Sequence, residues 1–203
     1  MALDDRVRED LAFIREAIEE GRGYATAGGR DMVVWGIAVA IGYLDSYAWR
    51  YGWSPIEPGW LWLATIGLPW LYSLRRVWGR AFAGEPSPPR PSPLVAALRM
   101  LWLGLGIFLT TLGVAAVWAG AMRYGWFNAV VAGTLGSGFF ATAALAGLPW
   151  LRWVAGAWWT GELAVFALRQ TPEAQLLSAV LMLALLAAPG LALIARRRKL
   201  AAA

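Results

Sequence analysis

Residues 100–122, a run of 23 residues with no charged side chain, constrain the fold of this chain more than any other feature. As an α-helix the run would be about 35 Å long, and the hydrocarbon core of a bilayer is about 30 Å thick. Helices in soluble proteins keep a polar face, whereas this run is apolar on all sides. The run therefore predicts a transmembrane helix that packs beside further helices.

The composition is typical of a membrane protein. Hydrophobic residues make up 59% of the 203 residues and charged residues only 15%, against about a quarter charged in soluble proteins. The 14 Trp suit membrane interfaces, and the 23 Gly suit close helix packing. The absence of Cys and His excludes disulfides, thiolate nucleophiles and most zinc or haem sites. We therefore expect no cofactor and no metal, and an enzyme is the least favoured class.

Apolar segments and their breaks divide the chain into helices. The predicted spans cover residues 32–48, 58–74, 100–122, 126–147, 151–168 and 174–195. The predicted fold class is all-α, a polytopic integral membrane protein with a six-transmembrane-helix bundle and an N-terminal amphipathic cytoplasmic helix. The predicted units are 1–30 (helix and Gly-rich connector), 31–83 (first helical hairpin), 84–93 (Pro-rich cytoplasmic linker), 94–198 (four-helix membrane unit) and 199–203 (a cloning scar).

The arginines predict the orientation in the membrane. With the N-terminus inside, the inside segments hold fourteen arginines and the outside segments hold three, which places both termini in the cytoplasm. The inside set is Arg6, Arg8, Arg15, Arg22, Arg30, Arg75, Arg76, Arg80, Arg90, Arg99, Arg152, Arg196, Arg197 and Arg198, and the outside set is Arg50, Arg123 and Arg169. The net charge of +5 follows the membrane and predicts no nucleic-acid partner. The expected location is a bacterial inner membrane.

Residues 3–21 predict an amphipathic helix. Val7, Leu11, Ile14 and Ile18 recur at spacings of four, three and four residues, which places them on one stripe with a heptad-like seam. The other face carries seven acidic residues against three arginines, so an anionic lipid surface would repel it. Two interpretations remain open. The helix caps the protein's own cytoplasmic face, or it docks a soluble partner or another copy of the chain.

Glu162 is the most informative single residue. It follows the predicted turn at 147–152 by ten residues, which places it about 15 Å deep, near the membrane midplane. An ionised carboxylate at that depth must be paired, protonated or in contact with water. The functional interpretation is a proton- or cation-coupled site with Trp158 and Trp159 as an aromatic wall. The structural interpretation is a neutral acid bonded to a neighbouring helix, by type to Thr134, Ser137, Thr142 or Thr160, with both indoles in the core.

Two further polar residues lie near the outer ends of predicted spans. Asp45 is shallower than Glu162 and has Arg50 or Arg123 as its expected ion-pair partner. Asn128 stands at the outer mouth of the fourth span, where it is a candidate for helix packing, for an oligomer contact or for a pore lining.

Small residues mark the fourth span. Gly133 and Ser137 form one small-xxx-small pair, and Gly138 and Thr142 form a second. Such spacing lets another helix approach closely. The pairs predict packing inside the bundle, an oligomer contact, or, at Ser137, a pore lining.

Two four-residue words occur twice in the same order. Residues 50–53 and 123–126 both read RYGW, and residues 67–70 and 147–150 both read GLPW. One interpretation is a parallel repeat of helical hairpins. The other is that each RYGW is an interfacial turn with a snorkelling arginine, aromatic anchors and a glycine that permits positive φ.

The N-terminal region resembles a group of uncharacterised bacterial inner-membrane proteins with a cytoplasmic N-terminal amphipathic helix. The resemblance covers the first 36 residues and is carried by Phe13-Ile14-Arg15, Glu20-Gly21-Arg22, Gly28-Gly29-Arg30 and Trp35-Gly36. It implies a membrane protein with a cytoplasmic first helix, and it implies no activity or site residue.

Two functions from different classes are consistent with these patterns. The first is an inner-membrane translocator of a small solute or ion, with Glu162 lining the path. The second is a non-transporting membrane scaffold or regulator that docks a soluble partner through its N-terminal helix. The expected partners are the lipid bilayer, other copies of the chain in a homo-oligomer, and a soluble cytoplasmic protein.

Overall fold

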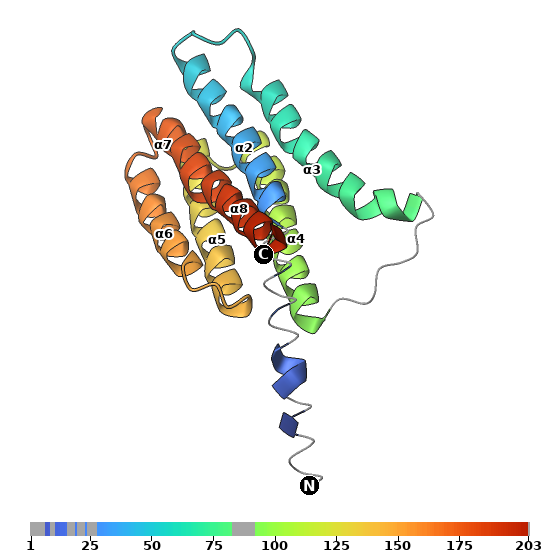
Figure 1. Ribbon diagram of the computed structural model, residues 1–203. Helices are drawn as coiled ribbons and strands as arrows, with labels where there is room; N and C mark the ends of the chain where they lie inside the picture. The colour runs from blue at the N-terminus through green and yellow to red at the C-terminus, as the bar shows by residue number, and fades with distance from the viewer. Residues whose placement is uncertain are drawn as a thin grey trace.

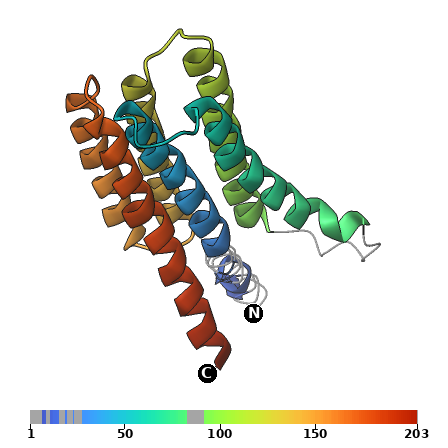
Figure 2. The ribbon, with the colours of Figure 1, turned by 90° about the horizontal axis from the view of Figure 1, so that it is seen from above.

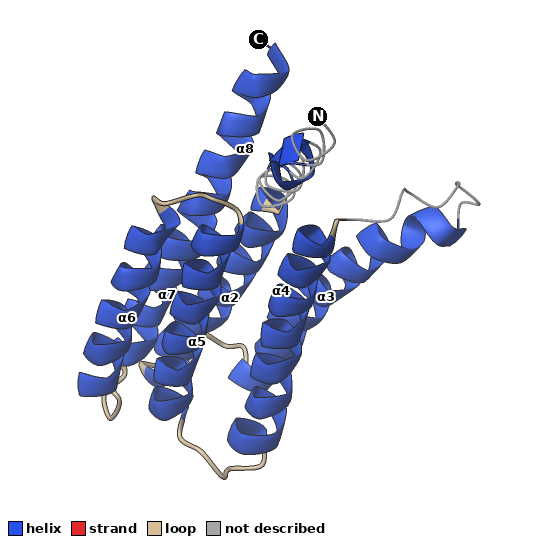
Figure 3. Cartoon of the chain, turned by 90° about the horizontal axis from the view of Figure 1, so that it is seen from below, coloured by secondary structure: helices blue, strands red, loops and turns tan. Residues whose placement is uncertain are grey.

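The computed structural model describes residues 7–8, 11–15, 19, 23, 28–82 and 92–202, and every regular element among them is a helix (Figures 1 and 3). The predicted all-α class is confirmed. The elements are α2 (Gly29–Arg50), α3 (Pro58–Phe82), α4 (Pro93–Leu112), the π-helical η1 (Gly113–Trp118), α5 (Tyr124–Leu145), α6 (Leu151–Ala167), α7 (Glu173–Met182), the π-helical η2 (Leu183–Ala187) and α8 (Ala188–Ala202).

Four helical stretches are long and apolar enough to cross a membrane. They are Gly29–Arg50, Pro93–Ala115, Gly125–Leu145 and Glu173–Arg196. The first, third, fourth and sixth predicted spans fall on these stretches. The other two fall on α3 and α6, which are helical but are not among the four, and α6 has only 17 residues. The six-span count therefore stays a prediction.

Local sequence explains where the middle helices begin and end. The Ser92 side chain accepts a hydrogen bond from the Val95 amide, and Pro93 occupies the first helical position, where its missing N–H costs nothing. The predicted linker is therefore one residue too long, and its residues 84–91 lie outside the described residues. The predicted span 100–122 is also too long, because helical structure ends at Trp118 and Gly120 adopts a φ of +74°.

The helix α2 lies at the centre of the bundle. It contacts α3 on one side and α7, η2 and α8 on the other, whereas α5 pairs with α6, and α4 packs on α5 (Figure 2). Glycines permit the closest approaches. A Cβ on Gly29 would lie 2.6 Å from the Gly190 carbonyl oxygen, and a Cβ on Gly36 would lie 2.8 Å from the backbone nitrogen of Ala187. Glycine spacing therefore sets how α2 meets α8 and η2.

Hydrogen bonds from tryptophan to hydroxyl groups connect successive helices. The donor–acceptor pairs are Trp35 Nε1–Ser73 Oγ (3.4 Å) and Trp62 Nε1–Ser46 Oγ (3.0 Å) between α2 and α3, Trp70 Nε1–Thr110 Oγ1 (3.1 Å) between α3 and α4, and Trp102 Nε1–Thr142 Oγ1 (3.0 Å) between α4 and α5. Interfacial belts alone therefore do not explain all the tryptophans. In a membrane such bonds hold helices together where hydrophobic attraction between them is weak.

Candidate functional site

The Glu162 carboxylate lies at the seam between α6 and α5. A Cβ built on Gly133 would come 2.6 Å from Oε1 and 2.7 Å from Oε2, so the carboxylate occupies the space that a side chain at this position would fill. Three residues away on each helix, a Cβ on Gly136 would meet the Trp159 indole at 2.6 Å. Glu162 is half-buried at this seam. The predicted small-residue position Gly133 and the predicted acid therefore lie together.

Three of the four hydroxyl groups expected to bond Glu162, those of Ser137, Thr142 and Thr160, bond their own helices instead. Ser137 Oγ donates to the Gly133 carbonyl at 3.0 Å, and Thr160 Oγ1 donates to the Gly156 carbonyl at 3.0 Å. Thr142 donates to its own helix and accepts from an indole of α4. Within the part of the chain that the structure describes, no hydrogen bond or ion pair reaches the Glu162 carboxylate. For the interpretation of Glu162 as a neutral acid bonded to a neighbouring helix, the described residues therefore provide no bonding partner.

The two tryptophans near Glu162 point in different directions. Trp158 is 1% exposed, and its Nε1 donates to the Leu185 carbonyl at 3.1 Å, inside η2. A π-helical turn leaves carbonyl groups off the regular α-helical ladder, and the indole satisfies one of them. Trp159 instead packs on Phe140, with ring centroids 5.5 Å apart, and stays 38% exposed. Trp158 is therefore a core residue, as the structural interpretation expects, and the two indoles do not form one wall in this structure.

Asp45 has a neutral partner. Ser54, in the loop after α2, donates its hydroxyl to Asp45 Oδ1, and Oδ2 is buried without a partner among the described residues. The expected ion pair with Arg50 or Arg123 is not formed in this structure. The physical reason is that the loop folds back, so Ser54 reaches the carboxylate first.

Asn128 connects α5 to α7. Its side chain is 2% exposed, and Nδ2 donates to Gln175 Oε1 at 3.0 Å. At the same end of the bundle the Tyr51 hydroxyl donates to Glu173 Oε1 at 3.2 Å. Desolvation, Tyr47 and the Glu173 carboxylate all raise the pKa of Tyr51, so the phenol keeps the proton that it donates. The buried Asn128 side chain therefore joins α5 to α7, an arrangement that agrees with helix packing among its predicted roles.

The other small residues of α5 face α4. A Cβ on Gly138 would lie 2.6 Å from Leu105 Cδ1, and Thr142 is 1% exposed and accepts from the Trp102 indole. Ser137 is exposed on the outer side of α5. The pair Gly138 and Thr142 therefore packs within the bundle, and Ser137 does not line the interior.

The two RYGW words have different backbone structures. At 50–53, α2 ends at Arg50 and Gly52 adopts a φ of +70°. At 123–126, α5 begins at Tyr124, so the second word starts a helix where the first word ends one. The two GLPW words also differ, since 67–70 lies inside α3 and 147–150 is the turn before α6. The words therefore do not mark a structural repeat.

Arg169 closes the end of the α5–α6 pair. Its guanidinium lies over the rings of Trp126 and Phe166, at 5.2 Å and 4.6 Å from their centroids, and donates to the Phe166 carbonyl at 2.9 Å. A Cβ on Gly125 would collide with the Arg169 carbonyl group. Gly125 is therefore required for close approach, a role that neither interpretation of its RYGW word includes.

The apolar stripe of the N-terminal helix is exposed where it is described. Val7, Leu11 and Ile14 are 50%, 50% and 52% exposed, and these helical residues lie beyond the end of the bundle (Figure 1). Ile18, the fourth member of the predicted stripe, lies outside the described residues. The described part of the stripe does not cap the bundle.

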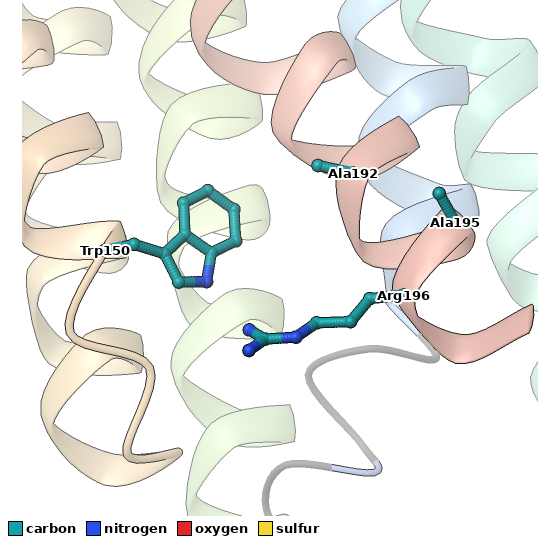
Figure 4. A pocket seen from close by; sticks show the side chains of 4 residues that line it. All are labelled: Trp150, Ala192, Ala195 and Arg196. Atoms are coloured by element: carbon teal, nitrogen blue, oxygen red, sulfur yellow. The ribbon is translucent and has the colours of Figure 1, made fainter. Parts of the chain in front are cut away.

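Two clefts open at opposite ends of the bundle. One, of about 380 Å³, is lined by Ser46, Trp49, Arg50, Glu57, Pro58, Pro172 and Gln175. The other, of about 550 Å³, is mainly apolar and is lined by Trp150, Ala192, Ala195 and Arg196 (Figure 4). Neither cleft includes Glu162. No group of three or more Asp or Glu side chains suitable for a metal occurs among the described residues.

Sequence reasoning missed the glycine contacts of α2 and both clefts. The residues Gly29 and Gly36 are visible in the sequence, but their contacts with α8 and η2 depend on helices about 150 residues away along the chain. Comparison of the chain with protein-family models, with curated proteins and with solved structures finds no match.

Proposed function

We propose that the protein is a non-transporting membrane scaffold that docks a soluble cytoplasmic partner through its N-terminal helix. The observation that carries this proposal is the exposed stripe of Val7, Leu11 and Ile14 beyond the bundle. The two clefts at the ends of the bundle do not have Glu162 in their linings, which agrees with a scaffold.

The chemistry of the helix indicates what kind of partner it docks. An amphipathic helix binds by laying its apolar stripe in an apolar groove. The polar face predicted for residues 3–21 carries seven acidic residues against three arginines, so the groove that fits it is flanked by basic side chains. Binding should therefore weaken as salt increases.

Crosslinking from two positions of the same helix tests this proposal. A photo-reactive residue at Leu11 should capture the partner in cells, whereas one at Phe13 should not, because Phe13 is exposed but lies off the stripe. Leu11→Asp should lower partner binding about ten-fold or more, and Phe13→Asp is the matched control. Equal capture from both positions, or equal loss in both variants, would exclude docking through the stripe.

The proposed topology has six spans, with both termini in the cytoplasm of a bacterium. It is supported by the helical structure of all six predicted segments and by the contact of Gly29 with Gly190, which brings the start of α2 beside α8. Green fluorescent protein fused after Arg198 should fluoresce, and alkaline phosphatase fused at the same place should be inactive. An active phosphatase fusion would contradict the orientation.

A second function, translocation of a proton or cation, is favoured by Glu162 alone. Its carboxylate has no bonding partner among the described residues and lies deep in the sequence-predicted span. Under this function Glu162→Gln should abolish flux in proteoliposomes, whereas Glu173→Gln, at the start of α7, should retain it. Flux in the Glu162→Gln variant equal to that of the original protein would remove Glu162 from any transport mechanism.

A further inference from the structure

We propose that the cleft between the start of α6 and the middle of α8 binds an anionic phospholipid. Trp150 stands at the start of α6, and Ala192, Ala195 and Arg196 project from α8. The Arg196 side chain extends across the cleft toward the Trp150 indole (Figure 4). Arg196 is the charged residue of this lining, and the cleft has a volume of about 550 Å³.

The walls of the cleft suit an acyl chain. Two alanines on α8 leave room beside the Trp150 indole. The opposite face of α8 packs inside the bundle, because Leu193 is fully buried and Gly190 meets α2. A polar solute would find few hydrogen-bonding groups along these walls. An apolar chain, in contrast, gains van der Waals contact with the methyl groups and the indole ring.

The charge at the mouth of the cleft suits an anionic headgroup. Arg196 is the last residue of the apolar stretch Glu173–Arg196, so on the proposed membrane insertion its guanidinium lies at the depth of the lipid phosphates. Two more arginines follow it at positions 197 and 198. The carboxylate of Asp31, at the same end of the bundle, is already paired with Arg76 at 2.7 Å. The positive charge at the cleft is therefore available to a phosphate.

Competition between two lipids that differ only in the headgroup tests this inference. The full-length protein in detergent is mixed with equal amounts of dioleoyl phosphatidylglycerol and dioleoyl phosphatidylcholine, and retained lipid is counted by native mass spectrometry. We expect retention of phosphatidylglycerol over phosphatidylcholine. Arg196→Gln should lower that retention about five-fold, whereas Arg198→Gln, which makes the same charge change outside the lining, should leave it within about two-fold.

A second pair of variants tests the apolar walls without changing charge. Ala192→Leu combined with Ala195→Leu fills the cleft and should remove the bound lipid, whereas Ala164→Leu, on an exposed face of α6, should retain it. Equal losses of phosphatidylglycerol in Arg196→Gln and Arg198→Gln would show diffuse charge attraction and would overturn the site. Retention of the lipid by the double leucine variant would also overturn it. Cosedimentation with membranes tests insertion separately, so loss of the lipid site leaves the scaffold proposal standing.

Discussion

The carboxylate of Glu162 occupies the space beside Gly133 that a larger side chain would fill, and Oε1 lies 2.6 Å from the point where a Cβ on Gly133 would stand. The acid of α6 and the glycine of α5 therefore form one packing unit. An alanine at this position of α5 has to push the carboxylate away from the seam. Because both residues lie on predicted spans, the displaced group has little water to move into.

Gly133→Ala should destabilise the protein by about 1 kcal/mol, as the cost of overpacking exceeds the gain in helix propensity. In a Glu162→Ala background the same substitution should become neutral or stabilising, since the atoms that the new methyl group meets are gone. A double-mutant cycle of unfolding free energies in detergent measures the difference. Additive effects would show that the carboxylate does not occupy this space.

Gly36→Ala should destabilise the protein by about 1–3 kcal/mol, because its Cβ would meet the rigid backbone of Ala187 and not a movable side chain. Gly156→Ala is the matched control. No atom lies within 4 Å of its Cβ position, so the change should stabilise α6 by up to about 1 kcal/mol. Thermal unfolding of both variants measures these shifts, and equal midpoints would contradict the close approach of α2 to η2.

The bond between Trp102 and Thr142 should contribute about 0.6 kcal/mol, as interhelical hydrogen bonds in membranes do on average. Trp102→Phe and Thr142→Val should each destabilise the protein, and the double variant should lose less than the sum. Trp153→Phe serves as the control, because Trp153 is 83% exposed. A coupling energy of zero would mean that the indole and the hydroxyl do not interact.

The glycines of the two RYGW words should respond differently to substitution. Gly52 needs a positive φ and has open space around it, so Gly52→Asn should be tolerated and Gly52→Ala should cost about 1 kcal/mol. At position 125 any Cβ would collide with the Arg169 carbonyl, so Gly125→Ala and Gly125→Asn should both destabilise the protein. Unfolding of the four variants compares them, and equal tolerance of Asn at both positions would contradict this distinction.

Sequence patterns predicted the helices better than the contacts between them. The fifth predicted span, 151–168, agrees with α6 to within one residue, because Gly147 adopts a φ of +60° and Pro149 precedes the helix. Hydropathy has no information on which neighbour a side chain meets. The spacing along the chain puts Trp158 four residues from Glu162, but it does not show that the Trp158 indole bonds η2.

The same limit applies to polar partners. The partner expected for Asp45 was an arginine, because charge is readable from sequence, but the loop brings Ser54 to it instead. The contact of Glu162 with Gly133 joins two residues that the sequence marked for separate reasons. Their proximity follows from the way α5 and α6 pair, and this is a property of the folded chain.

The π-helical turn η2 also fixes the rotational register of everything that follows it. Each residue of a helix advances the chain by about 100°, so deletion of one residue within 183–187 would rotate the whole of α8 by about that angle relative to α7. Gly190 would then turn away from Gly29, and Arg196 would turn away from Trp150. One extra residue in the middle of an apolar helix thus decides which side chains its far end presents.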